Sequence, residues 1–177
     1  MSPSRIREIL GSSILEAGFL SWGAAAAGPI AEDHARLLSW IRSGRHGDLS
    51  YMEARAPVLA DPACPSFLDG ARTIVVASIG FDRPAPPGDS LASAVARHAR
   101  GRDYHDVVSD RLRPILKRLR REVPGLRGRL FVDTAPIMEK AWARRAGLGW
   151  IGRNGLLVQR SFGTRTVLGG LAITAEV

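Results

Sequence analysis

The sequence predicts an α+β fold in which a mostly antiparallel central sheet is flanked by helices. Several stretches repeat apolar residues at steps of three and four, which is typical of helices that bury one face. Residues 73–80, TIVVASIG, form a nearly continuous apolar run rich in β-branched side chains, as in a strand buried on both faces. Helical and strand segments alternate only in part, which favours this fold class over a doubly wound parallel sheet.

The beginning of the chain predicts a helix, a strand and two further helices. The first helix ends near Gly18, and its buried face is made of Ile6, Ile9, Leu10 and Ile14. Residues 19–27, FLSWGAAAA, follow as a strand. A second helix is expected from about Glu32 to Arg42, with an apolar side formed by Leu37, Leu38 and Ile41. The segment 46–55, HGDLSYMEAR, begins a short helix for which Asp48 is the expected N-cap.

The rest of the chain predicts one long helix, one short helix and three more strands. The three prolines of residues 81–90 predict a loop. A basic helix from about Asp103 to Glu122, which Pro114 should kink or split, carries an apolar stripe of Val108, Leu112, Ile115, Leu116 and Leu119. Residues 129–134 predict a strand, and Pro136 is expected to open a helix that ends at the glycines 147 and 149. Residues 155–177 predict two strands about a turn at 162–164.

Composition restricts the class of protein. A chain of 177 residues with 45% hydrophobic content is expected to form one domain, residues 1–177. No apolar run approaches the roughly 20 residues that span a bilayer, and the first residues lack the apolar core of a signal peptide. We therefore expect a cytoplasmic protein with no membrane partner. Cys64 is the only cysteine, so a disulfide within the chain, and a zinc or iron-sulfur site built from several of its thiolates, are excluded.

The charge is basic and comes mainly from arginine. Lys and Arg number 25 against 17 Asp and Glu, for a net charge of +8, and only Lys117 and Lys140 are lysines. Arginine forms paired hydrogen bonds with phosphate and stacks on bases, which suits a nucleic acid or a cofactor that carries phosphate and amide groups. A GC-rich genome produces the same bias, so charge alone leaves nucleic-acid binding open.

Two segments indicate a functional site. Residues 131–154 place Asp133 where an apolar strand runs into a helix and a glycine-rich turn. If the Asp133 carboxyl faces a closed pocket, desolvation should raise its pKa and make it a proton donor; the alternative is that it caps the helix expected at Pro136. The second segment, GRDYH at 101–105, opens the long helix, which favours capping by its aspartate. Capping does not explain the other polar residues of this segment, Arg102, Tyr104 and His105, so we expect these residues to contact a ligand or substrate.

Five motifs occur together in one order. They are HGDLSYM at 46–52, DGARTIVV at 69–76, GRDYH at 101–105, VDTAP at 132–136 and AGLGWIGRN at 146–154. In this order they resemble the N-terminal, cobalamin-binding part of the epoxyqueuosine reductase family, which completes the queuosine base in tRNA. The resemblance implies a nitroreductase-like, cobalamin-processing fold and a cobalamin-dependent reduction of epoxyqueuosine in the anticodon region of tRNA.

The resemblance also implies roles for individual residues. Asp133 stands at the family's general-acid position, where it would protonate the epoxide oxygen. The implied cofactor-binding residues are Arg55, Arg102, Tyr104, His105, Asp133, Gly149, Trp150, Ile151, Gly152 and Arg153. The glycines would let the backbone approach the corrin amides, with core packing after the helix as the alternative. The family holds cobalamin without a protein histidine, so no metal ligand is assigned to His98 or His105.

The chain also departs from the family pattern. Ala54 stands where relatives have the first of two basic residues, so Arg55 forms a surface salt bridge in the alternative interpretation. Arg153 replaces a usual lysine, His98 a usual tyrosine, and Gly170 a common glutamate. The cysteine-rich module for two 4Fe-4S clusters and the helical-repeat tail are absent from these 177 residues. The chain is therefore expected to be a fragment or a stand-alone relative, with the clusters on a missing domain or a partner.

Several functions follow from these observations. If the chain is a reductase, its electrons must come from outside, for example from a ferredoxin-like module. Three alternatives remain open. They are a non-catalytic cobalamin-binding domain, a flavin-binding reductase on a related fold, and a basic tRNA-binding module without a cofactor.

Overall fold

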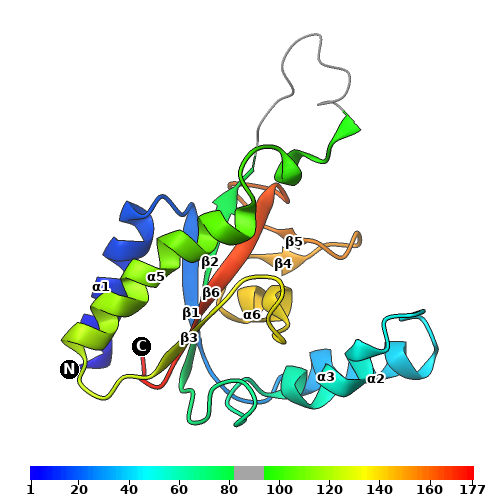
Figure 1. The fold of residues 1–177 in the computed structure, drawn as a ribbon, viewed down its shortest axis with the longest axis horizontal. Coiled ribbons are helices and arrows are strands. Elements are labelled where there is room, and N and C mark those ends of the chain that lie inside the picture. Colours follow the sequence, from blue (N-terminus) through cyan, green and yellow to red (C-terminus); the bar gives the residue numbers. More distant parts are fainter. Residues whose placement is uncertain (82–93) are drawn as a thin grey trace.

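A four-stranded antiparallel sheet forms the centre of the protein, as a computed structural model of residues 1–81 and 94–177 shows (Figure 1). Its strands, in spatial order, are β1 (Ser21–Ala26), β2 (Thr73–Gly80), β6 (Thr166–Ile173) and β3 (Gly128–Phe131). Each neighbouring pair is antiparallel. The predicted α+β class with an antiparallel sheet is therefore confirmed. The loop predicted over 81–90 lies, apart from Phe81, outside the described residues.

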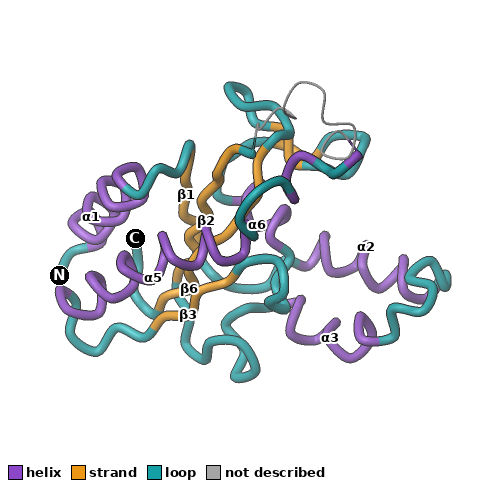
Figure 2. The backbone as a smooth tube through the Cα atoms, turned by 45° about the horizontal axis from the view of Figure 1, so that its top comes forward, coloured by secondary structure: helices purple, strands orange, loops and turns teal. Residues whose placement is uncertain are grey.

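Helices cover both faces of the sheet. On one face α1 (Pro3–Glu16) lies beside α5 (Tyr104–Glu122), and on the other face lies α6 (Glu139–Arg145) (Figures 1 and 2). Strand β2 explains the apolar run, because Val75 packs into the core under α1 and α5 while Ile74 packs into the core around Trp142 of α6. Both strand residues and Trp142 are almost completely buried, so the sheet separates two apolar cores.

The long helix α5 is preceded by a short 3-10 helix, η1 (Arg97–Ala99), and runs through Pro114. The predicted split at Pro114 is therefore wrong. The proline is exposed, so the carbonyl that loses its helical N–H partner faces the side of the helix open to water. The five residues of the predicted stripe are all buried.

Helices α2 (Ala31–Arg42) and α3 (Tyr51–Ala60) form an arm that extends away from the sheet (Figure 1). The predicted N-cap at Asp48 is wrong, since α3 starts at Tyr51 after Ser50 and no side chain caps it. Residues 44–48 turn instead between the two helices. At its base the arm is joined to α6, because the Arg144 guanidinium donates to the Asp33 carboxylate at 2.8 Å.

A small hairpin follows α6, formed by β4 (Trp150–Ile151) and β5 (Leu157–Val158). The predicted turn near 162–164 is present, closed by two hydrogen bonds between Gln159 and Gly163, but β5 pairs with β4 and not with β6. The buried Gln159 side chain ties this hairpin to the sheet, since its Oε1 accepts from the hydroxyls of Ser21 and Ser78. None of the helices within residues 1–81 and 94–177 has the length and apolar character to cross a membrane.

Candidate active site around Asp133

Asp133 lies directly after β3 at the centre of a tight turn. Its φ is +43°, and it is the only residue other than glycine in the described chain with positive φ. The Thr134 N–H reaches back to the Val132 carbonyl, N to O at 2.5 Å, so Asp133 is the middle residue of a three-residue turn. Val132 is buried beneath it. The turn therefore projects the Asp133 side chain away from the core.

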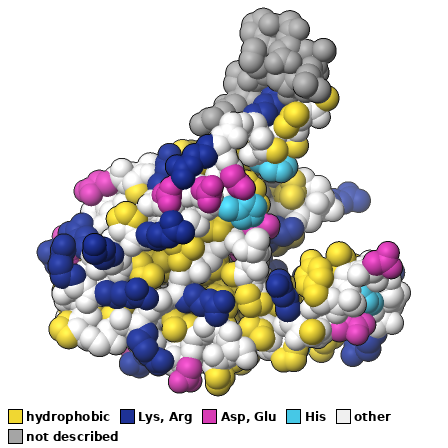
Figure 3. Space-filling view, viewed as in Figure 1, with side chains coloured by type: hydrophobic (Ala, Val, Ile, Leu, Met, Phe, Trp, Pro, Cys, Tyr) yellow, Lys and Arg dark blue, Asp and Glu magenta, His cyan; other side chains and the backbone are white. Residues whose placement is uncertain are grey.

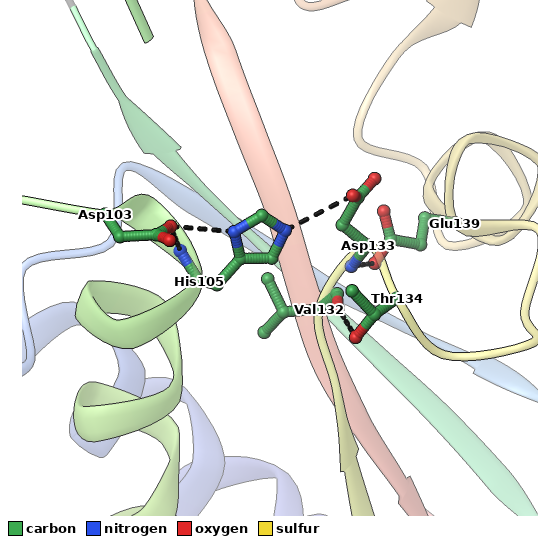
Figure 4. Close-up of polar contacts among 6 residues, drawn as sticks. All are labelled: Asp103, His105, Val132, Asp133, Thr134 and Glu139. Carbon is green, nitrogen blue, oxygen red and sulfur yellow. Dashed lines mark hydrogen bonds and ion pairs between the residues drawn. The ribbon is translucent and has the colours of Figure 1, made fainter. Parts of the chain in front are cut away.

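The Asp133 carboxylate faces a histidine from the opposite side of the site (Figure 4). Its Oδ2 lies 3.2 Å from Nε2 of His105, whose Nδ1 lies 2.7 Å from Oδ1 of Asp103. Asp103 is also the N-cap of α5 and accepts the His105 backbone N–H at 2.9 Å. The capping interpretation of GRDYH is thus confirmed for Asp103. The same cap orients the His105 ring between two carboxylates.

The two carboxylates change the protonation of the histidine. Partial burial acts to lower the pKa of His105, but hydrogen bonds to Asp103 and Asp133, together with their negative charges, raise it above its ordinary value. The backbone and side-chain hydrogen bonds from His105 lower the pKa of Asp103. The arrangement therefore favours a protonated imidazole in contact with the Asp133 carboxyl.

Tyr104 stacks on the same histidine. The two rings are 4.0 Å apart between centroids, at an interplanar angle of 27°. Burial, and then the negative charge of Asp133, raise the pKa of the Tyr104 phenol to about 12. Tyr104 therefore remains a neutral hydroxyl that can donate a hydrogen bond beside Asp133.

Glu139, the first residue of α6, is a site residue that the sequence analysis missed. Its Oε1 accepts the backbone N–H of Asp133 at 2.6 Å. Burial raises the pKa of Glu139 to about 7, the Asp133 N–H opposes that shift, and the Asp133 charge adds to it. The available signal was an acid six positions after Asp133, directly after the apolar residues 135–138.

Two adjoining hollows open beside these residues, and both are lined by Asp133, Glu139 and Lys140. The first hollow, of about 320 Å³, lies between α3 and the loop after Asp133, with further lining from Tyr51, Met52, Arg55, Leu59, Ile137 and Met138. The second hollow, of about 190 Å³, lies toward β5 and β6, with further lining from Tyr104, Leu156, Leu157, Thr164, Thr166 and Leu168. Lys140 also donates to the Gly155 carbonyl at 2.7 Å, which ties α6 to the hairpin.

The environment of Asp133 differs from both interpretations offered by the sequence. The condition of a closed pocket is not met, because the Asp133 side chain is 60% exposed at the rim of the two hollows. The helix-cap interpretation is also wrong. Helix α6 begins at Glu139, three residues later than expected at Pro136, and its N-cap Met138 receives no side-chain bond.

The predicted cofactor residues fall into three groups. Arg55, Tyr104, His105 and Asp133 lie together around the hollows. Arg55 places its guanidinium 5.1 Å from the Tyr51 ring centroid, and the structure shows no salt bridge for it among the described residues. Arg102 instead pairs with Asp110 on α5 and lines a different cavity on the far side of Tyr104.

The third group, in the glycine-rich segment, lines neither hollow. Trp150 and Ile151 form β4, with Trp150 half exposed, and Arg153 is exposed between β4 and β5. A Cβ on Gly149 would lie 2.1 Å from the Val158 carbonyl oxygen, and one on Gly152 would lie 2.8 Å from Asn154 Oδ1. The close approach that these glycines permit is therefore made within the hairpin. Gly147, with φ +81°, follows the end of α6.

The two hollows are lined by apolar side chains and a few polar groups. Within residues 1–81 and 94–177 no three His, Cys, Asp or Glu side chains gather in a way that could hold a metal. The hollows instead combine apolar walls with the polar groups of Arg55, Lys140 and Thr166. Apolar walls with a few polar groups are typical of a site for an organic ligand.

Comparison with known proteins identifies relatives over most of the chain. The family model described as "Epoxyqueuosine reductase QueG, DUF1730" matches residues 63–134. The epoxyqueuosine reductase of Leadbetterella byssophila is 36% identical over 149 residues, 84% of this chain and 48% of that protein. That of Cyclobacterium marinum is 35% identical over 168 residues, 94% of this chain and 53% of that protein. The chain spans about half the length of these curated relatives.

Solved structures agree with this result. Epoxyqueuosine reductase from Streptococcus thermophilus matches 98% of this chain and 47% of its own, with a TM-score of 0.81 and 25% identity. An epoxyqueuosine reductase with an epoxyqueuosine-modified tRNA-Tyr stem loop covers 98% of this chain and 46% of its own, at a TM-score of 0.80 and 21% identity. A reductive dehalogenase described as B12-dependent shares the fold, at a TM-score of 0.60 and 20% identity over 98% of this chain and 20% of its own. The resemblance carried by the five motifs is confirmed, because the chain matches about half the length of epoxyqueuosine reductases both in sequence and in fold.

Proposed function

We propose that this chain takes part in the cobalamin-dependent reduction of epoxyqueuosine to queuosine in tRNA, with Asp133 as the proton donor. The observation that carries the proposal is the chain of contacts from Asp103 through His105 to Asp133, which ends at the rim of both hollows. The site combines a carboxyl group, a protonated imidazole that can supply protons to it, and open space for a substrate. General-acid catalysis requires these features.

The two hollows would hold part of the cofactor. Arg55 and Lys140 would bind its amide or phosphate groups, while Met52, Ile137 and Leu156 would contact its apolar surface. When bound, cobalamin would supply a low-valent cobalt centre that passes electrons to the epoxide carbon. The likeness to a dehalogenase described as B12-dependent supports this cofactor. Trp150, Ile151 and Arg153 would contact only parts of the cofactor that extend over the hairpin.

The protein residues would manage the protons of the reaction. Conversion of the epoxide to an alkene consumes two electrons and two protons, and the oxygen leaves as water. Asp133 would take a proton from His105, which Asp103 keeps in the protonated form, and donate it to the epoxide oxygen. The electrons would come from outside the chain, through iron-sulfur clusters on another domain or a ferredoxin-like partner.

A tRNA substrate agrees with the relatives and with the charge. One relative is described in complex with an epoxyqueuosine-modified tRNA stem loop, and this chain carries a net charge of +8. Lys and Arg side chains spread over the face formed by α1 and α5, beside the acidic and histidine side chains at the start of α5 (Figure 3). The exposed basic residues of α5 include Arg113, Lys117, Arg120 and Arg121. We expect this face to contact RNA phosphates, and the protein to act in the cytoplasm.

The first experiment is an absorption titration of the purified chain with cobalamin, with desalting before each spectrum. A shifted corrin spectrum that remains with the protein supports the proposal, whereas retained flavin or a colourless protein that only binds RNA would contradict it. The second experiment supplies a low-potential chemical reductant and an epoxyqueuosine-modified stem loop.

The variants assign the proton-donor role. Asp133→Asn should retain cobalamin and lose stem-loop reduction by about two to four orders of magnitude. Asp48→Asn is the matched control, since Asp48 is an exposed acid on the arm that lines neither hollow. An unchanged rate in Asp133→Asn would remove Asp133 from the mechanism.

A further inference from the structure

The backbone of Asp133 is held in a conformation that its residue type disfavours. A positive φ brings the Cβ of an L-residue close to its own backbone, and such residues persist only where neighbouring contacts hold them. The turn bond from Thr134 N–H to the Val132 carbonyl is local and moves with the loop. A contact from a separate, well-packed element is therefore needed to fix the turn relative to the rest of the site.

Glu139 provides that contact. Its carboxylate accepts the Asp133 N–H at 2.6 Å. Glu139 lies at the first position of α6, and Ala141, Trp142 and Ala143 of the same helix are buried in the core. The helix is thus the fixed end of the hydrogen bond and the loop 133–138 is the end that depends on it. Figure 4 shows the Glu139 carboxylate turned toward the Asp133 backbone while the Asp133 side chain points toward His105.

We propose that Glu139 is a positioning residue for the reaction, whose carboxylate holds the Asp133 backbone so that the Asp133 carboxyl stays in contact with His105 and at the rim of both hollows. The proposal rests on the proposed role of Asp133. It adds a residue that acts through the Asp133 amide and does not itself touch the epoxide.

The charge on Glu139 makes this contact dependent on pH. An ionised carboxylate is a stronger acceptor for an amide N–H than a neutral acid. The charged groups that face Glu139 are Asp133, which disfavours its negative charge, and His105 and Lys140, which favour it. The Tyr104 phenol also faces Glu139 but is neutral, and the Glu139 charge helps to raise the Tyr104 pKa. With the pKa of Glu139 raised to about 7, the hydrogen bond should be strong in mildly alkaline solution and weaken as the pH falls through neutrality.

The test uses the whole chain without cofactor and follows the Asp133 amide by nuclear magnetic resonance and hydrogen exchange. In the wild-type protein the amide signal should titrate with a midpoint near pH 7. Glu139→Gln keeps an acceptor oxygen and removes the charge, so the signal should keep most of its position and lose the titration. Glu139→Ala removes the acceptor, and exchange of the Asp133 amide should speed up by about tenfold or more.

The control is Glu32→Ala, which removes another acid from the first turn of a helix, α2. Like Glu139→Ala, this variant removes a negative charge that stabilises the N-terminus of a helix, but it does not change the Asp133 loop. If Glu139→Ala and Glu32→Ala leave the Asp133 amide equally protected, Glu139 only stabilises its helix and the proposal is wrong. If the amide shows no titration in the wild-type protein, the pH dependence is wrong.

Activity provides a separate readout. In the stem-loop assay Glu139→Ala should lower kcat by about tenfold with KM for the RNA within about twofold, and Glu139→Gln should recover most of kcat while losing its pH dependence. An effect on KM alone would contradict the positioning role. Failure of cobalamin binding or of Asp133 chemistry would overturn the proposed function but would leave the amide measurements as an independent test of the Glu139 contact.

Discussion

His105 and Asp133 are 28 residues apart in the sequence but in contact in the structure, where Nε2 of His105 lies 3.2 Å from Oδ2 of Asp133. One residue belongs to the first turn of α5 and the other to the turn after β3, and both elements pack against β6. The contact is therefore a product of the sheet and its covering helix, and neither segment has it alone.

The protonation of His105 should control the supply of protons to Asp133. Because its pKa is raised, the ring stays protonated to a higher pH than an ordinary histidine, and this charge is lost as pH rises through the raised value. The stability that the charged ring contributes is likewise present below pH 6.5 and lost as pH rises through the folded pKa. Histidine NMR titration should show this shift.

Two variants test how Asp103 and His105 determine the pH dependence of the reaction. Asp103→Asn keeps an oxygen near Nδ1 and removes the negative charge, so the pKa of His105 should fall. The alkaline limb of the pH–rate profile, where the rate falls as His105 loses its proton, should therefore move to lower pH. His105→Gln should abolish that limb. An unchanged limb in His105→Gln would show that another group supplies the protons.

Glu139 should also make stability depend on pH. Its pKa of about 7 lies above the unfolded value of 4.5, so the unfolded chain releases this proton first and stability should fall as pH rises from about 4.5 to 7. The shift is about 2.5 pKa units. At about 1.4 kcal/mol per unit its upper limit is about 3.5 kcal/mol, and partial exposure of Glu139 reduces it. Denaturant unfolding across this range should show a shallower pH slope in Glu139→Gln than in the wild type. Equal slopes would place the titration elsewhere.

The ion pair of Arg144 and Asp33 should hold the arm to the rest of the fold. Both side chains are half-buried, so loss of the arginine leaves a poorly solvated carboxylate. Arg144→Ala should therefore lower the free energy of unfolding by about 1 to 3 kcal/mol and make residues 31–60 more sensitive to proteolysis. Arg36→Ala, which breaks the exposed pair with Glu32, is the control and should cost less than about 0.5 kcal/mol. Similar proteolysis of both variants would contradict the role of Arg144.

Gly170 leaves no room for the glutamate that many relatives are expected to have there. A Cβ at this position of β6 would lie 2.0 Å from the Val75 carbonyl oxygen and 2.4 Å from the Phe131 ring. Gly170→Ala should destabilise the protein by about 1 to 3 kcal/mol through overpacking, and Gly170→Glu by more. Gly155→Ala, exposed with φ +72°, is a control for backbone strain without crowding. If Gly170→Ala lowers the melting temperature less than Gly155→Ala does, strand β6 can shift to make room for the added methyl group.

The elements with strong periodicity could be predicted from the sequence, because their burial is set locally. The stripe of α5 and the two-sided burial of β2 are examples. The start of α6 was predicted three residues too early, since Pro136 has the right chemistry for a first turn but the strained turn at Asp133 delays the helix to Glu139. The pairing of β5 with β4 depends on tertiary contacts of Gln159 that no local pattern reveals.

Only part of the candidate site could be predicted, because some of its residues have distinctive local sequence and others act through tertiary contacts. Asp133 and His105 were identified by their unusual local settings and by the resemblance, and the structure brings them together. Glu139 was missed because its role comes from a hydrogen bond to a backbone amide, and a sequence motif describes side chains only. The exposure of Asp133 could not be read from its apolar neighbours, since their side chains turn inward at the bend that turns Asp133 outward.

The arm has a consequence for the width of the site. One wall of the first hollow is α3, and the opposite wall is the Asp133 loop and α6. Helix α3 packs against α2, and α2 is held to α6 by Arg144 and Asp33. The distance across the hollow is therefore set by the angle of the arm, so a ligand that touches both walls should clamp the arm in place, and the arm in turn should act as a gauge of ligand size.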